Sequence, residues 1–264
     1  MKPIAELAAI LDDAAREVRA VSQIDPDNRL ALEAAYAIQK ASIGRRVARG
    51  ETRAGVKMGF TSRAKMVQMG ISDLIWGRLT SGMQIEEGGS VAFKRFVHPR
   101  AEPELAFVLK KSLAGDVTLA QAFASIEAVA PALEVIDSRY QDFKFSLTDV
   151  VADNASSSGF VLGPWCDPAP DFSNLGLTMN IDGRVVQVGS TAAILGHPLR
   201  SLVAAARLSA AAGEPLQPGW VVMAGGATPA EWLKPGSYVS VEVERLGVAG
   251  FHVGAAPSAE GERT

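Results

Sequence analysis

The sequence predicts an α+β fold. An N-terminal helical lobe (residues 1–80) precedes a mixed, mostly antiparallel β roll or barrel (residues 81–255) and a flexible tail (residues 256–264). Apolar residues recur at helical spacing in the first part of the chain, whereas strand-like runs dominate after Ser90 and do not alternate strictly with helices. Neither GxGxxG nor GxxxxGK[ST] occurs, so a nucleotide-binding doubly wound fold lacks its usual signature.

Two helices are expected at the start of the chain. The first covers residues 4–21, where apolar residues return every three or four positions, and the turn-forming sequence at 24–28 ends it. The second covers residues 30–48 and stops before Gly50, because glycine favours the end of a helix. A further short helix is expected within residues 63–76.

Strands are expected over most of the remaining chain, because β-branched and aromatic residues gather there in short runs bounded by turn residues. Asp182 and Gly183 separate two of these runs and predict a hairpin. Two more helices are expected over residues 119–130 and 198–212. The expected strands are residues 55–62, 91–97, 104–110, 159–163, 175–181, 184–189, 220–225 and 238–244.

Composition excludes several classes of function. The chain of 264 residues has a net charge of −3, which gives no electrostatic basis for binding nucleic acid or an anionic membrane surface. No uninterrupted apolar run approaches the roughly 18 residues that a membrane helix needs. Cys166 is the only cysteine, so no internal disulfide forms. Acidic residues interrupt the N-terminal region early, and a cytoplasmic protein without a secretory signal is expected.

A pair of carboxylates points to a metal site. Glu102 and Glu104 are two residues apart in an expected strand, so they face the same side. Two carboxylates about 4 Å apart repel by roughly 4 kcal/mol at an effective dielectric of ~20, so a partly buried pair needs a cation or a shared proton. Glu134 follows another apolar stretch and is a candidate third ligand. An all-carboxylate set suits Mg²⁺ or Mn²⁺ rather than Zn²⁺, although the spacing alone also fits a solvated strand face.

Several segments together resemble a known family. They are similar to the 4-oxalocrotonate decarboxylases, which stand with the 2-hydroxypenta-2,4-dienoate hydratases in a branch of the fumarylacetoacetate-hydrolase-like superfamily. The combination is specific for this group and less specific for decarboxylase against hydratase. The segments are GVKMGFTSRAKMVQMGI (55–71), HPRAEPELAFVLKK (98–111), PALEVIDSRYQDFKF (131–145), VVADNASSSGFVLG (150–163) and LGHPL (195–199).

The resemblance implies both a fold and an activity. It implies N-terminal helices with a mixed β roll, and one Mg²⁺ or Mn²⁺ held at the positions of Glu102, Glu104 and Glu134. The implied reaction is decarboxylation of a small 2-oxo dicarboxylic acid, 4-oxalocrotonate (2-oxo-3-hexenedioate), to 2-hydroxypenta-2,4-dienoate and CO₂ in the catabolism of aromatic compounds. It also implies a homo-oligomer and a complex with the hydratase of the same pathway.

Four further residues are candidates for the active site. The resemblance places a functional lysine at Lys57, and a lysine in an apolar strand must pair with an anion or lose its charge. Ser157 and Ser158 lie in the polar segment 153–158 and are candidates for binding the substrate, as is Thr228 in a glycine-rich loop. Each has a plainer alternative: Lys57 as a surface lysine, the serines as part of a turn, and Thr228 as a structural loop residue.

Two alternative functions remain open. Family hydratases carry acidic residues in the stretch that matches residues 79–83, where this chain has Ser81 and Gly82. Without that carboxylate the site has less means to activate water, which favours the decarboxylase over the hydratase. The second alternative is a non-catalytic partner subunit of the hydratase, and the intact set of three glutamates argues against it.

Overall fold

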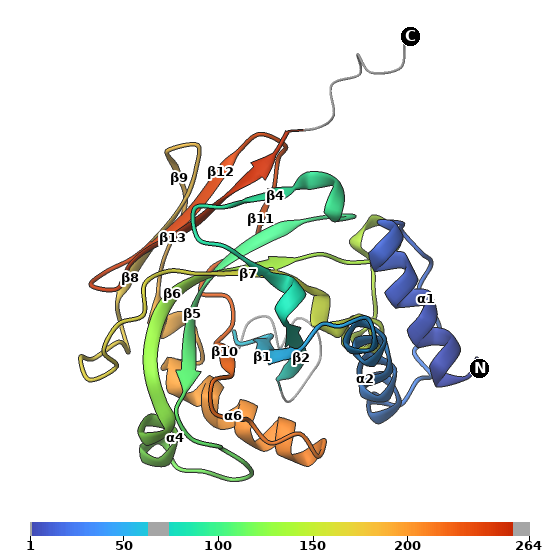
Figure 1. Cartoon of the computed structure of the whole chain (residues 1–264), viewed down its shortest axis with the longest axis horizontal. Helices are drawn as coiled ribbons and strands as arrows, with labels where there is room; N and C mark the ends of the chain where they lie inside the picture. Colours follow the sequence, from blue (N-terminus) through green and yellow to red (C-terminus); the bar gives the residue numbers. More distant parts are fainter. Residues whose placement is uncertain (1, 63–73, 256–264) are drawn as a thin grey trace.

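The computed structural model describes residues 2–62 and 74–255, and strands of two β-sheets form the body of this part (Figure 1). The larger sheet has the order β2-β1-β10-β5-β6-β7-β3, and β11 also pairs with β5. Its strands are β1 Arg53–Gly59, β2 Ile75–Thr80, β3 Gln84–Ile85, β5 Arg100–Leu109, β6 Ile126–Ile136, β7 Ser157–Leu162, β10 Val221–Met223 and β11 Glu231–Trp232. The smaller sheet has the order β4-β13-β12-β8-β9, with strands β4 Ser90–Ala92, β8 Gly176–Ile181, β9 Arg184–Ser190, β12 Tyr238–Val243 and β13 Gly247–Gly254.

Most neighbouring strands are antiparallel. The parallel pairs in the described residues are β1 with β10, β13 with β4, and β3 with β7. The long strands β5 and β6 pair along almost their whole length and curve together (Figure 1). The predicted α+β class with a mixed, mostly antiparallel sheet is therefore confirmed. Strands β1 and β2, which fall within the stretch expected as a helical lobe, belong to the larger sheet.

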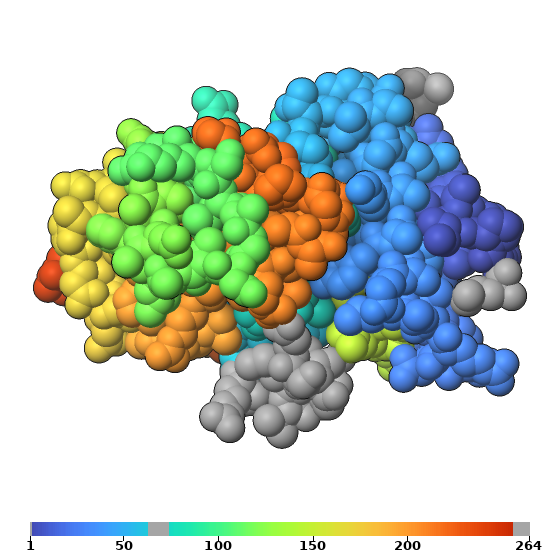
Figure 2. All heavy atoms as spheres, turned by 90° about the horizontal axis from the view of Figure 1, so that it is seen from below, coloured from blue at the N-terminus to red at the C-terminus, as the bar shows by residue number. Residues whose placement is uncertain are grey.

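Helices cover one end of the larger sheet, where α1 packs on α2 and α2 packs on α5. In the space-filling view, the N-terminal helices form one end of the molecule and lie beside α6 (Figure 2). None of the described helices is long and apolar enough to cross a membrane. The helices are α1 Ile4–Glu17, α2 Leu32–Ala48, α4 Leu119–Ser125, α5 Leu147–Ala152 and α6 Pro198–Ala211.

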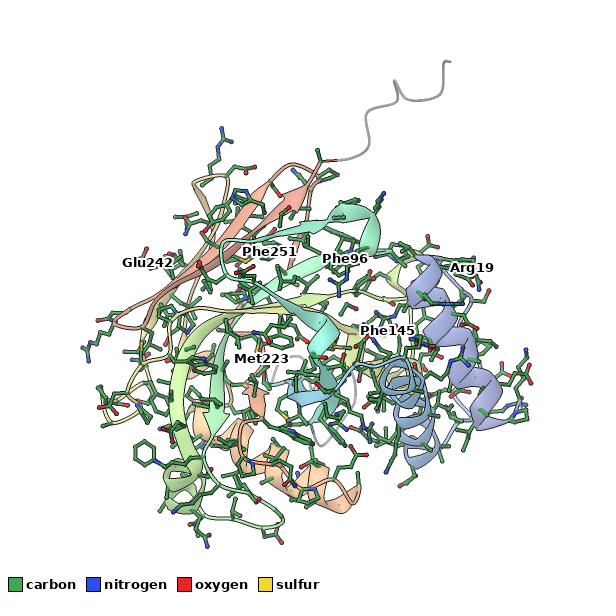
Figure 3. All side chains as sticks on the ribbon, in the orientation of Figure 1. Arg19, Phe96, Phe145, Met223, Glu242 and Phe251 are labelled. Atoms are coloured by element: carbon green, nitrogen blue, oxygen red, sulfur yellow. The ribbon has the colours of Figure 1, made fainter. Side chains whose placement is uncertain are left out.

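The largest apolar cluster lies between the two sheets. Leu105 and Phe107 of β5 and Val222 of β10 contribute to it from the larger sheet, and Phe251 of β13 from the smaller one (Figure 3). All four are fully buried. Each large apolar side chain removed from water in this way contributes about 1.5–3 kcal/mol. One face of β5 is therefore fixed in the core, and its alternate residues must point to the opposite face.

Several predicted elements agree with the structure, and one is partly wrong. The second predicted helix corresponds to α2 and the helix over 198–212 to α6, while the Asp182-Gly183 hairpin is present with positive φ at both residues, 52° and 77°. The helix predicted over residues 119–130 is wrong beyond Ser125, because β6 begins at Ile126 and pairs with β5. Tertiary pairing here outweighs the helical propensity of the alanines.

Two further predictions differ at their ends. The first helix stops at Glu17, where Val18 adopts a left-handed conformation with φ of 52°. The strand expected over residues 91–97 is only β4, and a 3₁₀ turn over Phe93–Arg95 follows it. Most of the helix expected within residues 63–76 lies outside the described residues, and Ile75 begins β2.

Candidate metal centre and active site

Three carboxylates meet on one face of the larger sheet. Glu102 lies directly opposite Glu134 in the antiparallel pairing of β5 with β6, and Glu104 is two residues further along β5. This register places all three side chains on the same face. One oxygen from each lies within 4.8 Å of the other two. The structure therefore brings together the three glutamates that the sequence singled out.

The three carboxylates place negative charge in a mostly buried region, which requires compensation by positive charge. Glu104 and Glu134 are fully buried, while Glu102 is partly exposed. Burial raises the pKa of Glu104 well above its ordinary value, and the negative charge of Glu134 raises it further. Burial also raises the pKa of Glu134. Like charges directly opposite in a sheet are destabilising, so ionising all three groups requires cations nearby.

Lys57 supplies one of these cations. Its side chain points from β1 into the cluster, is 3% exposed, and places Nζ 3.0 Å from Oε2 of Glu134. Nζ also donates a hydrogen bond to the carbonyl oxygen of Ala155 at 2.9 Å. Burial lowers the pKa of Lys57, but the negative charges of Glu134, Glu104 and Glu102 outweigh burial and raise it overall. Lys57 is therefore held as an ammonium ion.

One ammonium leaves carboxylate oxygens without partners. Oε1 of Glu104 and Oε1 of Glu134 are buried and accept no hydrogen bond from the described residues. Buried carboxylate oxygens are costly to leave unpaired. A hard divalent cation takes oxygen ligands of this kind, and Mg²⁺ in particular binds carboxylates while keeping several waters. The donor set therefore fits Mg²⁺ or Mn²⁺.

A glycine pair brings the backbone close to the glutamates. The N–H of Gly225 donates a hydrogen bond of 2.7 Å to Oε2 of Glu104. Gly225 has φ of 103°, and a Cβ there would lie 2.3 Å from Thr61. A Cβ on Gly226 would lie 2.7 Å from Oε2 of Glu102. The absence of a side chain at these glycines lets the loop backbone lie close to the glutamates. The sequence analysis identified this loop as rich in glycine.

A left-handed turn holds the partner of Lys57. Asn154, Ala155 and Ser156 have φ of 54°, 51° and 59°, a conformation that residues other than glycine rarely adopt in succession. The Asn154 side chain fixes this turn because it accepts from the N–H of Arg78 at 2.8 Å and donates to its carbonyl at 2.9 Å. Asn154 lies in the polar segment 153–158 noted in the sequence, but no sequence signal revealed its contact with β2.

The three predicted substrate-binding residues lie in different surroundings. Ser157 is buried near Glu134, and its hydroxyl makes no well-oriented hydrogen bond to the described residues. The Ser158 hydroxyl accepts a hydrogen bond of 2.5 Å from Arg139. Thr228 donates to the carbonyl of Pro229 at 3.0 Å. Ser157 is thus the one beside the glutamates, whereas the hydroxyls of Ser158 and Thr228 already have partners.

Arg139 forms buried ion pairs with two aspartates. Its Nε lies 2.5 Å from Oδ1 of Asp153, and Asp137 is at 4.0 Å. A cavity of about 480 Å³ lies next to Arg139 and Ser158, and none of the three clustered glutamates lines it. The cavity is therefore separate from the carboxylate cluster.

Comparison with known proteins identifies relatives along nearly the whole chain. The family model for the fumarylacetoacetate (FAA) hydrolase C-terminal region matches residues 62–253. A 4-oxalocrotonate decarboxylase from a Pseudomonas species is 55% identical over 94% of this chain and 97% of its own. The 2-hydroxyhexa-2,4-dienoate hydratase of Comamonas testosteroni is 34% identical, over 90% of this chain and 92% of its own.

A solved structure agrees with these sequence relatives. It is the 4-oxalocrotonate decarboxylase from Pseudomonas putida G7, complexed with magnesium and adipate, with a TM-score of 0.92 and 37% identity. The similarity covers 95% of this chain and 97% of that one. The family expected from the sequence is confirmed. This chain belongs to the fumarylacetoacetate hydrolase family, in the branch that contains the 4-oxalocrotonate decarboxylases and the dienoate hydratases.

Proposed function

We propose that the chain is a carbon–carbon lyase that decarboxylates 4-oxalocrotonate to 2-hydroxypenta-2,4-dienoate and CO₂, with Mg²⁺ or Mn²⁺ as cofactor. The observation that carries this proposal is that three carboxylates converge beside a buried lysine. Two of these carboxylates have buried oxygens without hydrogen-bond partners. The decarboxylase relative at 55% identity supports the reaction, and the magnesium in the solved relative supports the metal.

The chemistry requires a sink for an electron pair. When the bond to the terminal carboxylate breaks, its electron pair moves through the double bond to the oxygen of the 2-oxo group, and CO₂ leaves. Glu102, Glu104 and Glu134 would hold a divalent cation, which would supply Lewis-acid stabilisation of the negative charge at that oxygen. The Lys57 ammonium, 3.0 Å from Glu134, is placed to hold part of the same charge or to deliver a proton.

The remaining site residues are proposed to bind the substrate. The Ser157 hydroxyl is buried near Glu134, so it is available to an oxygen of the 2-oxo acid. Ser158 and Thr228 would have to release their present partners, Arg139 and Pro229, to do the same. Ser157 is therefore the strongest of the three candidates, ahead of Ser158 and Thr228.

The hydratase is the second candidate, since it would use the same metal and the same 2-oxo acid group. Hydratase relatives are more distant, at 34% identity for the Comamonas testosteroni enzyme. The structure adds one observation about this choice. The Glu51 carboxyl lies next to Gly82, since a Cβ on Gly82 would be 2.6 Å from it. Thr80 and Arg46 already donate hydrogen bonds to this carboxyl. This engagement makes Glu51 a poor base and favours the decarboxylase.

The proposal also covers the cellular location, the oligomeric state and the partner enzyme of the chain. The chain would act in the cytoplasm as a homo-oligomer, in complex with the hydratase that consumes its product in aromatic catabolism. A dienol is a reactive product that reverts to its keto form in water, so transfer to the next enzyme would protect it. A non-catalytic role as a partner subunit is disfavoured, because nothing about a scaffold requires three converging glutamates.

One assay tests the activity directly. The purified chain is incubated with 4-oxalocrotonate and Mg²⁺, and both CO₂ and the hydrated product 4-hydroxy-2-oxopentanoate are followed. We expect CO₂ without hydrated product, and no CO₂ in EDTA. Hydrated product would instead establish the hydratase, and neither product, together with no thermal stabilisation by Mg²⁺, would indicate a scaffold.

The metal ligands are tested by the charge-removing changes Glu102→Gln and Glu104→Gln. Each is expected to abolish CO₂ release and stabilisation by Mg²⁺ while preserving the fold. Glu127→Gln is a matched control, because Glu127 is an exposed residue of the same strand as Glu134. Activity that survived both Glu102→Gln and EDTA would contradict the metal site.

A further inference from the structure

An arginine stands at the outer end of the row of glutamates. Arg100, Glu102 and Glu104 alternate on β5, so their side chains share one face of the sheet. Exposure changes along this row: Glu104 is fully buried, whereas Glu102 and Arg100 are partly exposed. A ligand that binds beside Glu104 and extends toward solvent along the strand would therefore pass Glu102 and reach Arg100.

Two aromatic rings hold the Arg100 guanidinium. Its central carbon lies 3.9 Å from the ring centre of Trp232 and 4.0 Å from that of Phe143. Trp232 pairs with Arg100 in the β11–β5 register, and Phe143 comes from a turn in which Asp142 and Phe143 both have φ of 57°. The two contacts restrict the position of the guanidinium, which reduces the entropy lost when it binds an anion.

The guanidinium has no carboxylate partner in the part of the chain that the structure describes. Among the described residues, Glu102 is the acidic group whose charge acts on Arg100, without a hydrogen bond between them, and the Arg100 Nε is buried without a hydrogen-bond partner. Partial burial lowers the pKa of Arg100 and the negative charge of Glu102 opposes this, but arginine remains charged at neutral pH. A held, charged and incompletely bonded guanidinium is suited to an external carboxylate.

We propose that Arg100 binds the terminal carboxylate of the substrate and so makes the site selective for six-carbon 2-oxo diacids over 2-oxo monoacids. The inference rests on the proposed function, because it requires the 2-oxo acid end to bind at the three glutamates. Two residues of a strand advance about 6.7 Å, so Arg100 is offset from Glu102 by a distance comparable to an extended six-carbon chain.

The guanidinium acts on binding more than on the chemical step. It stabilises the substrate carboxylate, and this attraction is lost when the group leaves as neutral CO₂. Arg100 therefore strengthens ground-state binding, so its removal should raise KM and should not lower kcat. The same loss of charge weakens retention of the monoacid product. Arg100 is thus assigned to specificity, and Lys57 to the charge that develops during the reaction.

The test compares two ligands that differ only at the far end. 2-Oxoadipate and 2-oxohexanoate share the 2-oxo acid group and chain length, and only the former carries a second carboxylate. Their affinities are measured by calorimetry with Mg²⁺ for the wild type and Arg100→Met. In the variant we expect binding of 2-oxoadipate to weaken by about tenfold to a hundredfold, and binding of 2-oxohexanoate to stay the same.

Arg184→Met is the control for loss of one positive charge, because Arg184 is exposed on β9 in the other sheet. It should leave both affinities unchanged. If Arg100→Met is unstable, Trp232→Leu releases the guanidinium from one ring while keeping its charge, and the preference for 2-oxoadipate should fall. Trp232 is 49% exposed, so this change spares the core.

The outcomes separate this inference from the proposed function. A wild type that binds both 2-oxo acids, with the same diacid preference in Arg100→Met, would overturn the role of Arg100 and leave the metal site standing. A wild type that binds neither ligand with Mg²⁺ would overturn both. Decarboxylation by Arg100→Met with a raised KM and a kcat that is not lowered would agree with the inference.

Discussion

At the residue scale, the proposed active site contains one buried lysine among three carboxylates. Lys57 compensates part of their charge, since its Nζ lies 3.0 Å from Glu134 and its pKa is raised overall by the surrounding glutamates. The carbonyl of Ala155 fixes the direction of the ammonium. The surrounding negative charge favours the protonated form of this amine, so we propose that it acts as a cation or an acid rather than as a base.

Replacing Lys57 tests that role. Lys57→Ala is expected to lower kcat by about a hundredfold or more and to raise KM much less, because the ammonium meets charge that develops only during the reaction. Steady-state kinetics of CO₂ release measure both constants. Lys110→Ala, on an exposed lysine that follows β5, is the control and should change neither. A change in KM alone would reassign Lys57 to ground-state binding.

At the element scale, the site combines a regular ladder with an irregular turn. The β5–β6 ladder sets Glu102 opposite Glu134 without any special backbone. The turn at Asn154–Ser156 is the opposite case, because three successive residues adopt positive φ. Strain of this kind persists only when surrounding contacts hold it. The two hydrogen bonds of Asn154 to the backbone of Arg78 provide that support.

The turn predicts a coupled effect on stability and rate. Asn154→Ala removes two buried hydrogen bonds and places alanine at φ of 54°, so it should lower the free energy of unfolding by about 3 kcal/mol. It should also lower kcat, since the turn presents Ala155 to Lys57. Urea denaturation and CO₂ release measure the two effects.

A second asparagine provides the matched control for that change. Asn28 also has φ of 54° but lies exposed in a turn, so Asn28→Ala should cost less than about 1 kcal/mol and leave kcat intact. An unchanged kcat in stable, folded Asn154→Ala would mean that Lys57 keeps its position without the turn.

At the scale of the whole molecule, one ion cluster joins the helical end to the sheet. Glu214, just after α6, binds Arg53 of β1 at 2.6 Å, Arg78 of β2 at 2.8 Å and Lys40 of α2 at 3.2 Å. Burial raises the pKa of Glu214, but hydrogen bonds from Arg78 and Arg53 outweigh it and lower the pKa to about 2. The cluster therefore connects elements that lie far apart in the sequence.

This cluster predicts a pH dependence of stability. The folded pKa of about 2 lies below the ordinary 4.5, so the contribution of Glu214 is complete above pH 4.5 and is lost as the pH falls toward 2. Glu214→Gln should therefore cost about 3 kcal/mol at pH 7 and progressively less below pH 4.5. Urea denaturation across this range measures the difference.

Glu242→Gln serves as the control for Glu214, because Glu242 is exposed on the outer side of β12 (Figure 3). It should show a small and nearly constant effect. A gap between Glu214→Gln and the wild type that stayed constant down to pH 3 would contradict the role given to the ion cluster.

The sequence predicted the parts of the site that follow from local geometry. Glu102 and Glu104 share a face because strand residues alternate, which holds wherever the strand lies. The position of Glu134 opposite Glu102 depends on the register of β5 with β6, which no local sequence pattern fixes. In addition, residues 126–130, which begin β6, were predicted to be helical. The fold class followed from periodicity, while the insertion of β10 between β1 and β5 is a tertiary pairing with no local signal.

Contacts between distant polar groups were the least predictable features. Arg139 pairs most closely with Asp153 and more distantly with Asp137, and its residue type alone does not distinguish between them. Phe143 and Trp232, which contact the Arg100 guanidinium, come from two other segments of the chain. Such contacts depend on how loops return to the sheet, and the residue types alone permit many pairings.

The order of strands has a consequence for how the protein matures during synthesis. Within the larger sheet, Lys57 on β1 is connected to the glutamates of β5 and β6 through β10, which pairs with both β1 and β5. The lysine and the glutamates leave the ribosome before residues 221–223 do. A nascent chain that lacks these residues is missing the strand between β1 and β5, so we expect that it does not yet hold the proposed catalytic centre together.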